Sequence, residues 1–178
     1  MRIDQAIATE RLLIRPFVQD DLNAVLSYAT DPQVMHYMEE GALDAQGVSD
    51  FIDKQCSDDA TAFAIVLKSN QQLIGHMVFH LWFAPRTYEL GWVLHPTYQG
   101  QGHASEAARA LLRYAFINLQ AHRVIATCQP ENRPSYRVME KLGMRREGHF
   151  RQCIDRGNGI WWDEYFYAIL SEEWNASA

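Results

Sequence analysis

The amino-acid sequence predicts a mixed α/β (α+β) fold, arranged as one domain of residues 1–178 around a central sheet. Three observations lead to this prediction. Segments typical of strands and of helices alternate along the chain, the length suits a single domain with a substantial core, and no linker, repeat or low-complexity tract divides it. The predicted order is strand, helix, helix, three strands, helix, strand, helix and two strands.

The first strand is predicted at residues 9–17 (TERLLIRPF), where Pro16 closes it. A helix is expected to follow from an N-cap at Asp20 to Asp31, because its apolar residues recur at helical spacing. A second helix is expected to start after Asp44.

Three strands and a long helix are predicted next. Residues 62–83 contain two strand-like runs split by a polar turn at residues 68–71, which is a hairpin signal. A turn at residues 84–86 leads into the third strand, residues 87–96. The helix that follows is expected to span residues 102–119.

The last part of the chain is predicted to add a strand at residues 123–128, a short helix and two antiparallel strands. Pro134 suits the first turn of that helix, and Gly143 suits its end. The final strands are expected at residues 144–154 and 159–170.

Composition argues against several classes of function. The formal net charge of −6, with no run of Lys or Arg, argues against a general binder of nucleic acid or of anionic membranes. No apolar run approaches the roughly 20 residues of a membrane span, and the start of the chain lacks the core of a signal peptide. The three widely spaced cysteines are expected to be free thiols in a reducing cytoplasm, and the scattered histidines predict no metal site.

The stretch from Gln99 to Ser105 (QGQGHAS) predicts an anion-binding turn. Gly100 and Gly102 permit a positive φ, so the backbone there can lie close to another molecule. The helix that follows leaves its first N–H groups without partners at the positive end of its dipole. We therefore expect this turn to hold a phosphate-bearing cofactor.

Two common phosphate loops do not fit this turn. The mononucleotide loop requires a Lys followed by Ser or Thr, and the dinucleotide fingerprint requires a third Gly where Ser105 stands. The pattern Q-x-x-G-x-A at Gln99, Gly102 and Ala104 instead resembles the pyrophosphate loop of the GNAT superfamily of N-acetyltransferases. The segments TERLLIRPFVQDDL, NRPSYRVMEKLGM and WWDEYFYAIL resemble its RimJ/RimL-like branch of ribosomal-protein N-terminal acetyltransferases.

This resemblance implies a mostly antiparallel sheet of about seven strands flanked by four helices. It also implies a central strand pair that splays apart to admit acetyl-coenzyme A (acetyl-CoA). By resemblance, the end of the strand at residues 87–96 lines the pantetheine cleft, and the anion-binding turn holds the diphosphate. The loop before the short helix that contains Pro134 adds further contacts. The cofactor-binding residues expected on this basis are Trp92, Val93, Leu94, His95, Gln99, Gly100, Gln101, Gly102, His103, Ala104, Ser105, Asn132 and Ser135.

Acetyl transfer from a thioester to an amine needs a base, because an alkylammonium is protonated at neutral pH. Glu89 is the candidate, since it lies in an apolar strand where burial would raise its pKa. The resemblance also places the family's catalytic strand Glu at this position. The alternative is that Glu89 has no catalytic role and that its carboxylate pairs with an Arg or faces water. Asp155 is a second candidate, although an Asp just ahead of Gly157 is also a typical turn residue.

The proton donor departs from the commonest family pattern, N-x-x-A-x-x-x-Y-x-K-x-G-F. Asn132 and Gly143 align with its Asn and Gly, but Met139 stands in the place of the Tyr and cannot donate a proton. The RimJ/RimL-like branch implies that Ser135 takes this role. The alternative is that Ser135 only satisfies free helix amides and that Asn132 is a turn residue.

The sequence therefore predicts a cytoplasmic, acetyl-CoA-dependent N-acetyltransferase that acts by direct attack in a ternary complex. The expected acceptor is a protein N-terminal α-amine. Two alternatives stay open: a small amine such as a polyamine or an antibiotic, and a non-catalytic acyl-CoA-binding module. We expect no nucleic-acid or membrane partner, and either a monomer or a homodimer paired through the C-terminal strands.

Overall fold

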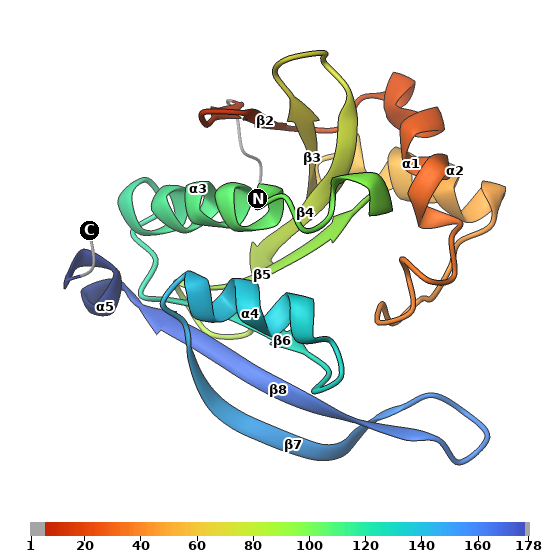
Figure 1. Cartoon of the computed structure of the whole chain (residues 1–178). Helices are drawn as coiled ribbons and strands as arrows, with labels where there is room; N and C mark the ends of the chain where they lie inside the picture. The colour runs from red at the N-terminus through yellow and green to blue at the C-terminus, as the bar shows by residue number, and fades with distance from the viewer. Residues whose placement is uncertain (1–5, 177–178) are drawn as a thin grey trace. The chain divides into compact units, whose positions relative to one another are not determined.

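A computed structural model describes residues 6–176 (Figure 1). Within them the chain has a mixed α/β fold with an eight-stranded, mostly antiparallel open sheet and five α-helices. The strand order is β1-β2-β3-β4-β5-β6-β8-β7. The strands are β1 (Ile7–Ala8), β2 (Leu12–Arg15), β3 (Ala62–Leu67), β4 (Leu73–Leu81), β5 (Thr87–Leu94), β6 (Arg123–Cys128), β7 (Arg145–Asp155) and β8 (Trp161–Leu170). The helices are α1 (Leu22–Ala29), α2 (Ala45–Gln55), α3 (His103–Ile117), α4 (Arg133–Lys141) and α5 (Ser171–Ala176), with short 3-10 helices η1 (Gln19–Asp21) and η2 (Pro96–Tyr98).

The predicted fold class is confirmed, but two short elements were not expected. The strand predicted at residues 9–17 is shorter in the structure, because its first residues form a tight turn in which the Thr9 N–H donates to the Leu12 carbonyl and the Leu12 N–H donates to the Thr9 hydroxyl, both at 2.9 Å. The residues before this turn form β1, and α5 follows β8 at the other end of the sequence. The described residues therefore hold eight strands and five helices rather than about seven and four.

The start of α1 also differs from the prediction. Asp20 lies exposed in η1, and the N-cap position of α1 is held by Asp21, whose side chain makes no capping hydrogen bond. The Asp21 carboxylate accepts hydrogen bonds from both Nη1 and Nη2 of Arg15 at 2.7 Å and from the Val18 N–H at 2.9 Å. At α2 the prediction is confirmed, because Asp44 is the N-cap and its Oδ1 accepts the Gly47 N–H at 2.7 Å.

The chain divides into two compact units. Among the described residues, the first contains residues 6–80 together with Gly91–Leu111, and the second contains Leu81–Leu90 and residues 112–176. In the first unit, β2 pairs antiparallel with β3 and β3 with β4, while α1 and α2 contact each other (Figure 1). The core of this unit is built from apolar side chains of the helices and the sheet, among them Val25, Tyr28, Val48, Ile52, Ala64 and Val66.

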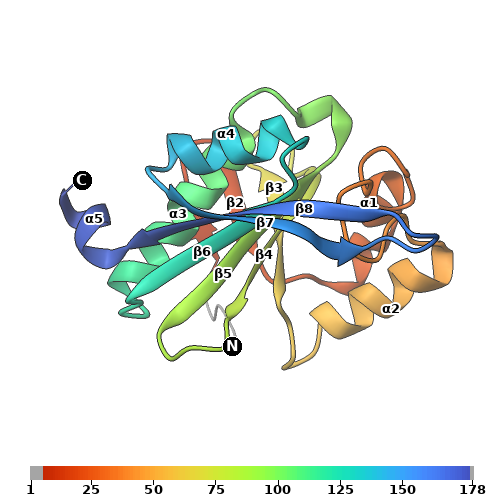
Figure 2. The ribbon, with the colours of Figure 1, turned by 90° about the horizontal axis from the view of Figure 1, so that it is seen from below.

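In the second unit, β5 begins parallel to β6, with residues 87–89 in register with residues 123–125. β6 pairs antiparallel with β8 and β8 with β7, so these three strands lie side by side (Figure 2). α4 contacts β6, and α5 contacts β8. β5 runs on to Leu94, beyond the last of the paired positions. The splayed strand pair and the single-domain organisation stay predictions.

Three further properties bear on function. No helix among residues 6–176 is long and apolar enough to cross a membrane. In the same part of the chain, no cluster of three or more His, Cys, Asp and Glu side chains could hold a metal ion. The three cysteines are unpaired: Cys128 is buried, Cys56 is half-buried and Cys153 is exposed.

Candidate active site

The predicted cofactor turn connects η2 to α3. Its glycines adopt the positive φ that the sequence predicts, +72° at Gly100 and +83° at Gly102. The helix begins at His103, so Ala104 and Ser105 lie in its first turn. A Cβ atom built on Gly100 meets no heavy atom of the described residues within 4 Å. The backbone at this position can therefore be approached closely by another molecule.

The backbone of this turn presents a row of hydrogen-bond donors. On either side of it the N–H groups are used: Gln99 donates to the Pro96 carbonyl at 3.1 Å, and Glu106 donates to the Gly102 carbonyl at 3.0 Å. Between them, the N–H groups of residues 100–105 make no hydrogen bond to any residue in the described part of the chain. This run of donors at the positive end of α3 fits a phosphate group.

The polar side chains of the turn are directed to backbone carbonyls. The Gln99 Nε2 donates to the Leu94 carbonyl at 2.9 Å, which ties the turn to the end of β5. The Gln101 Nε2 donates to a carbonyl of η2 at 2.7 Å, and Nδ1 of the buried His103 ring lies 3.2 Å from another. These three predicted cofactor residues therefore fix the shape of the turn, and its N–H groups are what a phosphate would meet.

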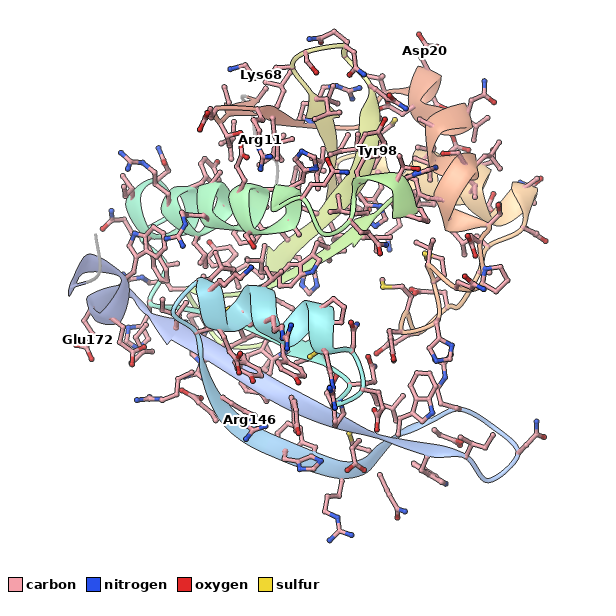
Figure 3. The ribbon with its side chains drawn as sticks, in the orientation of Figure 1. Arg11, Asp20, Lys68, Tyr98, Arg146 and Glu172 are labelled. Carbon is pink, nitrogen blue, oxygen red and sulfur yellow. The ribbon has the colours of Figure 1, made fainter. Side chains whose placement is uncertain are left out.

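Arg11, which the sequence did not single out, lies against this turn (Figure 3) and is paired with Glu106, a second such residue. The Glu106 Oε1 accepts the Thr9 hydroxyl at 2.6 Å and the Arg11 N–H at 2.9 Å, while its Oε2 accepts the Arg11 Nε at 2.6 Å. Burial alone would raise the pKa of Glu106, but these hydrogen bonds and the Arg11 charge outweigh it and hold the pKa below its ordinary value. Glu106 is therefore a carboxylate at neutral pH.

A sequence signal for this pair did exist. An acidic residue in the first turn of a helix that is expected to bind phosphate places two negative charges close together. Such an arrangement implies a neutralising cation nearby. Which of the 16 Lys and Arg residues provides it could not be inferred from spacing, because Arg11 is 95 residues away from Glu106.

The residues expected to line the pantetheine cleft form the end of β5 and its exit. Trp92 is half-buried, and the next two residues are buried. Gly75 of β4 allows a close approach here, since a Cβ at this position would lie 2.2 Å from the Val93 carbonyl oxygen. His95 is the N-cap of η2, and its Nδ1 accepts the Thr97 N–H at 3.2 Å. This geometry agrees with a structural role for His95, and the pantetheine contacts stay predictions.

The two candidate bases have different surroundings. Glu89 is half-buried on β5, opposite Ile125 of β6. Asp155 is exposed at the end of β7, and its Oδ1 accepts the Gly157 N–H at 2.8 Å, which is the geometry of a turn residue. Glu89 is therefore the more enclosed of the two carboxylates, and its role as the base stays a prediction.

The candidate proton donor, Ser135, lies in the first turn of α4. Asn132 is the N-cap of this helix, and its Oδ1 accepts the Ser135 N–H at 3.4 Å. The capping role given above as the alternative for Asn132 is therefore present, and its contact with pantetheine stays a prediction. Met139, which stands in the place of the usual Tyr, is fully buried.

Cys128 of β6, another residue that the sequence did not point to, lies beside Ser135, whose hydroxyl is placed to donate to the Cys128 sulfur. Burial raises the pKa of Cys128 to about 12, and the bond from Ser135 opposes this rise. At neutral pH Cys128 is thus a thiol.

Comparison with known proteins gives a consistent result. Residues 11–145 match the family described as "Acetyltransferase (GNAT) domain". The uncharacterized N-acetyltransferase YnaD of Bacillus subtilis is 54% identical over 169 residues, which cover 95% of this chain and 99% of that protein. The structure of an acetyltransferase (GNAT family) from Bacillus anthracis is similar with a TM-score of 0.90 and 52% identity, covering 94% of this chain and 99% of that one.

More distant relatives have names that differ in the acceptor. Spermidine N(1)-acetyltransferase of Escherichia coli is 26% identical over 76% of this chain and 73% of its own length. The putative ribosomal N-acetyltransferase YdaF of Bacillus subtilis is 33% identical over 50% of this chain and 48% of its own length. The family match, the similarity over nearly the full chain and the donor-rich turn before α3 agree, and the chain belongs to the GNAT family of acetyl-CoA-dependent N-acetyltransferases.

Proposed function

We propose that this N-acetyltransferase acts on primary amines and that its preferred acceptor is a protein N-terminal α-amine. The use of acetyl-CoA as the acetyl donor is supported by the run of N–H groups at residues 100–105 that make no hydrogen bond within the described part of the chain. Such a run at a helix start binds phosphate oxygens well, and acetyl-CoA carries a diphosphate. Residues 92–95 are assigned to the pantetheine arm.

The roles of the reacting side chains follow from the chemistry. The amine nitrogen forms a bond to the acetyl carbon, the carbon–sulfur bond breaks, and one proton must leave the nitrogen while one reaches the sulfur. We assign the first proton to Glu89, directly or through a water molecule, and the second to the Ser135 hydroxyl.

The preference for an α-amine rests on proton affinity. An α-amine has a pKa of about 8, whereas an alkylamine has a pKa above 10, so far more of the α-amine is neutral at pH 7. A single half-buried carboxylate such as Glu89 is then sufficient as a base. Polyamines are the second candidate acceptor, supported by the relative named as a spermidine acetyltransferase.

A thiol-release assay with acetyl-CoA as the donor tests this proposal. The panel pairs each peptide that has a free N-terminus with the same peptide formylated at that end and carrying an internal lysine, and it adds spermidine and spermine. We expect turnover only with free N-termini, with the acetyl group located on the α-amine by mass spectrometry. Turnover of the polyamines alone would assign the second acceptor, and tight acetyl-CoA binding with no turnover would indicate a non-catalytic module.

Substitutions test the roles of the side chains in the same assay. Glu89→Gln and Ser135→Ala are each expected to lower kcat by about 100-fold, the ordinary effect of removing an acid or base, with the Kd for acetyl-CoA within about twofold. Ser27→Ala on the exposed face of α1 is the matched control and should change neither value. If Asp155→Asn lowers kcat and Glu89→Gln does not, the base is Asp155.

A further inference from the structure

The turn at residues 9–12 is attached to the first turn of α3 by one carboxylate. Both oxygens of Glu106 are used: Oε1 accepts from the Thr9 hydroxyl and the Arg11 N–H, and Oε2 accepts from the Arg11 Nε. The Glu106 carboxylate is mostly buried, with 19% of the side chain exposed. The start of β2 is therefore fixed to the helix that follows the phosphate-binding turn.

This attachment gives the Arg11 guanidinium a defined position beside the turn (Figure 3). Its Nη1 donates to the Gln101 carbonyl at 3.1 Å. Its Nη2 lies 3.4 Å from the place that a Cβ on Gly102 would occupy, so this nitrogen is next to the Gly102 backbone. Among the contacts of residues 6–176, no hydrogen bond uses Nη2, and 43% of the Arg11 side chain is exposed.

The charges around the turn indicate what the position of Arg11 is for. The N–H groups of the turn favour an anion, but the Glu106 carboxylate in the same helical turn repels one. Arg11 neutralises Glu106 through Nε and keeps Nη2, with its two N–H bonds, on the side of Gly102. A guanidinium held on one side by a carboxylate is well suited to bind a phosphate with its remaining donors.

We propose that Arg11 binds a phosphate group of the acetyl donor through Nη2 and that Glu106 and the Gln101 carbonyl hold it in position to do so. This inference rests on the proposed use of the turn for acetyl-CoA. The phosphate is either the diphosphate or the 3′-phosphate of the ribose, and the two share the same chemistry. The competing explanation is that Arg11 only braces the turn through the Gln101 carbonyl.

Binding of three ligands to the wild type and to Arg11→Gln separates these explanations. The ligands are coenzyme A, dephospho-coenzyme A, which lacks the 3′-phosphate, and pantetheine, which has no phosphate. We expect Arg11→Gln to raise the Kd for coenzyme A by about tenfold, the effect of one charge-assisted hydrogen bond, and to leave the Kd for pantetheine within about twofold. Lys68→Gln is the matched control, because its exposed Nζ donates to the Thr9 carbonyl at 3.0 Å on the far side of the same turn.

Each outcome has a defined meaning. A loss for coenzyme A and not for dephospho-coenzyme A assigns Arg11 to the 3′-phosphate, and equal losses assign it to the diphosphate. An unchanged Kd for coenzyme A, or an equal loss with pantetheine, overturns the proposal. Arg11→Lys, which keeps the charge, should lose less affinity than Arg11→Gln, and equal losses would also count against it. If the wild type itself does not bind coenzyme A, the proposed function fails rather than the role of Arg11.

Discussion

Replacing Gly75 with alanine tests the close approach of β4 to the end of β5. The added Cβ would lie 2.2 Å from the Val93 carbonyl oxygen and 2.8 Å and 2.9 Å from two atoms of Leu94. Two of these three atoms belong to the backbone, so no side-chain rotation can relieve the overlap. Gly75 also has a φ of +155°, which residues with a side chain rarely adopt.

The magnitude follows from these two effects. Overpacking costs about 1–3 kcal/mol, and a backbone conformation reserved for glycine costs about 1–3 kcal/mol more. We therefore expect Gly75→Ala to lower the free energy of unfolding by roughly 4 kcal/mol. For a chain of this size each kcal/mol lowers Tm by about 2–4 °C, so Tm should fall by about 8–16 °C. Because the overlap is with the strand expected to bind pantetheine, affinity for acetyl-CoA should fall as well.

Thermal unfolding followed by circular dichroism measures this effect, and Gly91→Ala is the control. Gly91 is on β5, and its added Cβ would lie 3.5 Å from the nearest atom, the Val78 Cβ, which is an ordinary contact. Its replacement should change stability by less than about 1 kcal/mol. If Gly75→Ala unfolds within 2 °C (about 1 kcal/mol) of Gly91→Ala, β4 does not approach the end of β5 closely enough to exclude a side chain, and the prediction is wrong.

Two further predictions concern buried polar groups of the first unit. Burial lowers the pKa of His76 to about 4 in the folded protein, whereas its pKa in the unfolded chain is about 6.5. The free energy of unfolding is therefore at its full value above pH 6.5 and declines as the pH falls towards 4, by at most about 1.4 kcal/mol per pH unit, because the unfolded chain takes up the proton first. His76→Gln should flatten this decline in urea unfolding at pH 7 and pH 5, and an unchanged slope would show that other groups cause it. Asp21→Asn should cost about 3 kcal/mol, because it leaves the half-buried Arg15 charge without its partner. Asp20→Asn in the same turn is exposed and should be nearly neutral, so equal effects of the two substitutions would contradict the assignment of the ion pair.

Local signals were sufficient for most of the fold. Residues 123–128 form a strand with the predicted bounds, because a short β-branched run between turns has few alternatives. Pro134 and Gly143 mark the start and end of α4, since proline suits a first helical turn and glycine suits the position after the helix, where φ is +81°. These positions depend on the chemistry of one or two residues, which the sequence displays directly.

The errors arose where side-chain contacts decide the local structure. Asp20 and Asp21 are equally good capping residues in the sequence, but the Asp21 carboxylate is engaged by Arg15 and the Val18 N–H and makes no capping hydrogen bond to α1. Residues 9–17 read as one strand, but the Thr9 hydroxyl closes a turn and also donates to Glu106. A propensity scale has no access to these side-chain contacts, because Arg15 is six residues before Asp21 and Glu106 is 97 residues after Thr9.

The same distinction holds for the candidate site. The positive φ of Gly100 and Gly102 could be predicted, since it follows from the residue type and from the helix behind it. The contact of Arg11 with the turn could not, because it depends on how β2 lies against α3. Asp155 shows the reverse case: its sequence context already indicated a turn residue, and the hydrogen bond to the Gly157 N–H has that geometry.

The attachment of Thr9 and Arg11 to Glu106 has a consequence for refolding kinetics. The hydrogen bonds join positions 97 and 95 residues apart, and closing so long a loop is slow compared with forming a helix or a hairpin. A chain diluted from denaturant would regain its far-ultraviolet helical signal before these bonds form. Recovery of coenzyme affinity should lag behind that signal, since the brace on the phosphate-binding turn is completed only when the two distant segments meet.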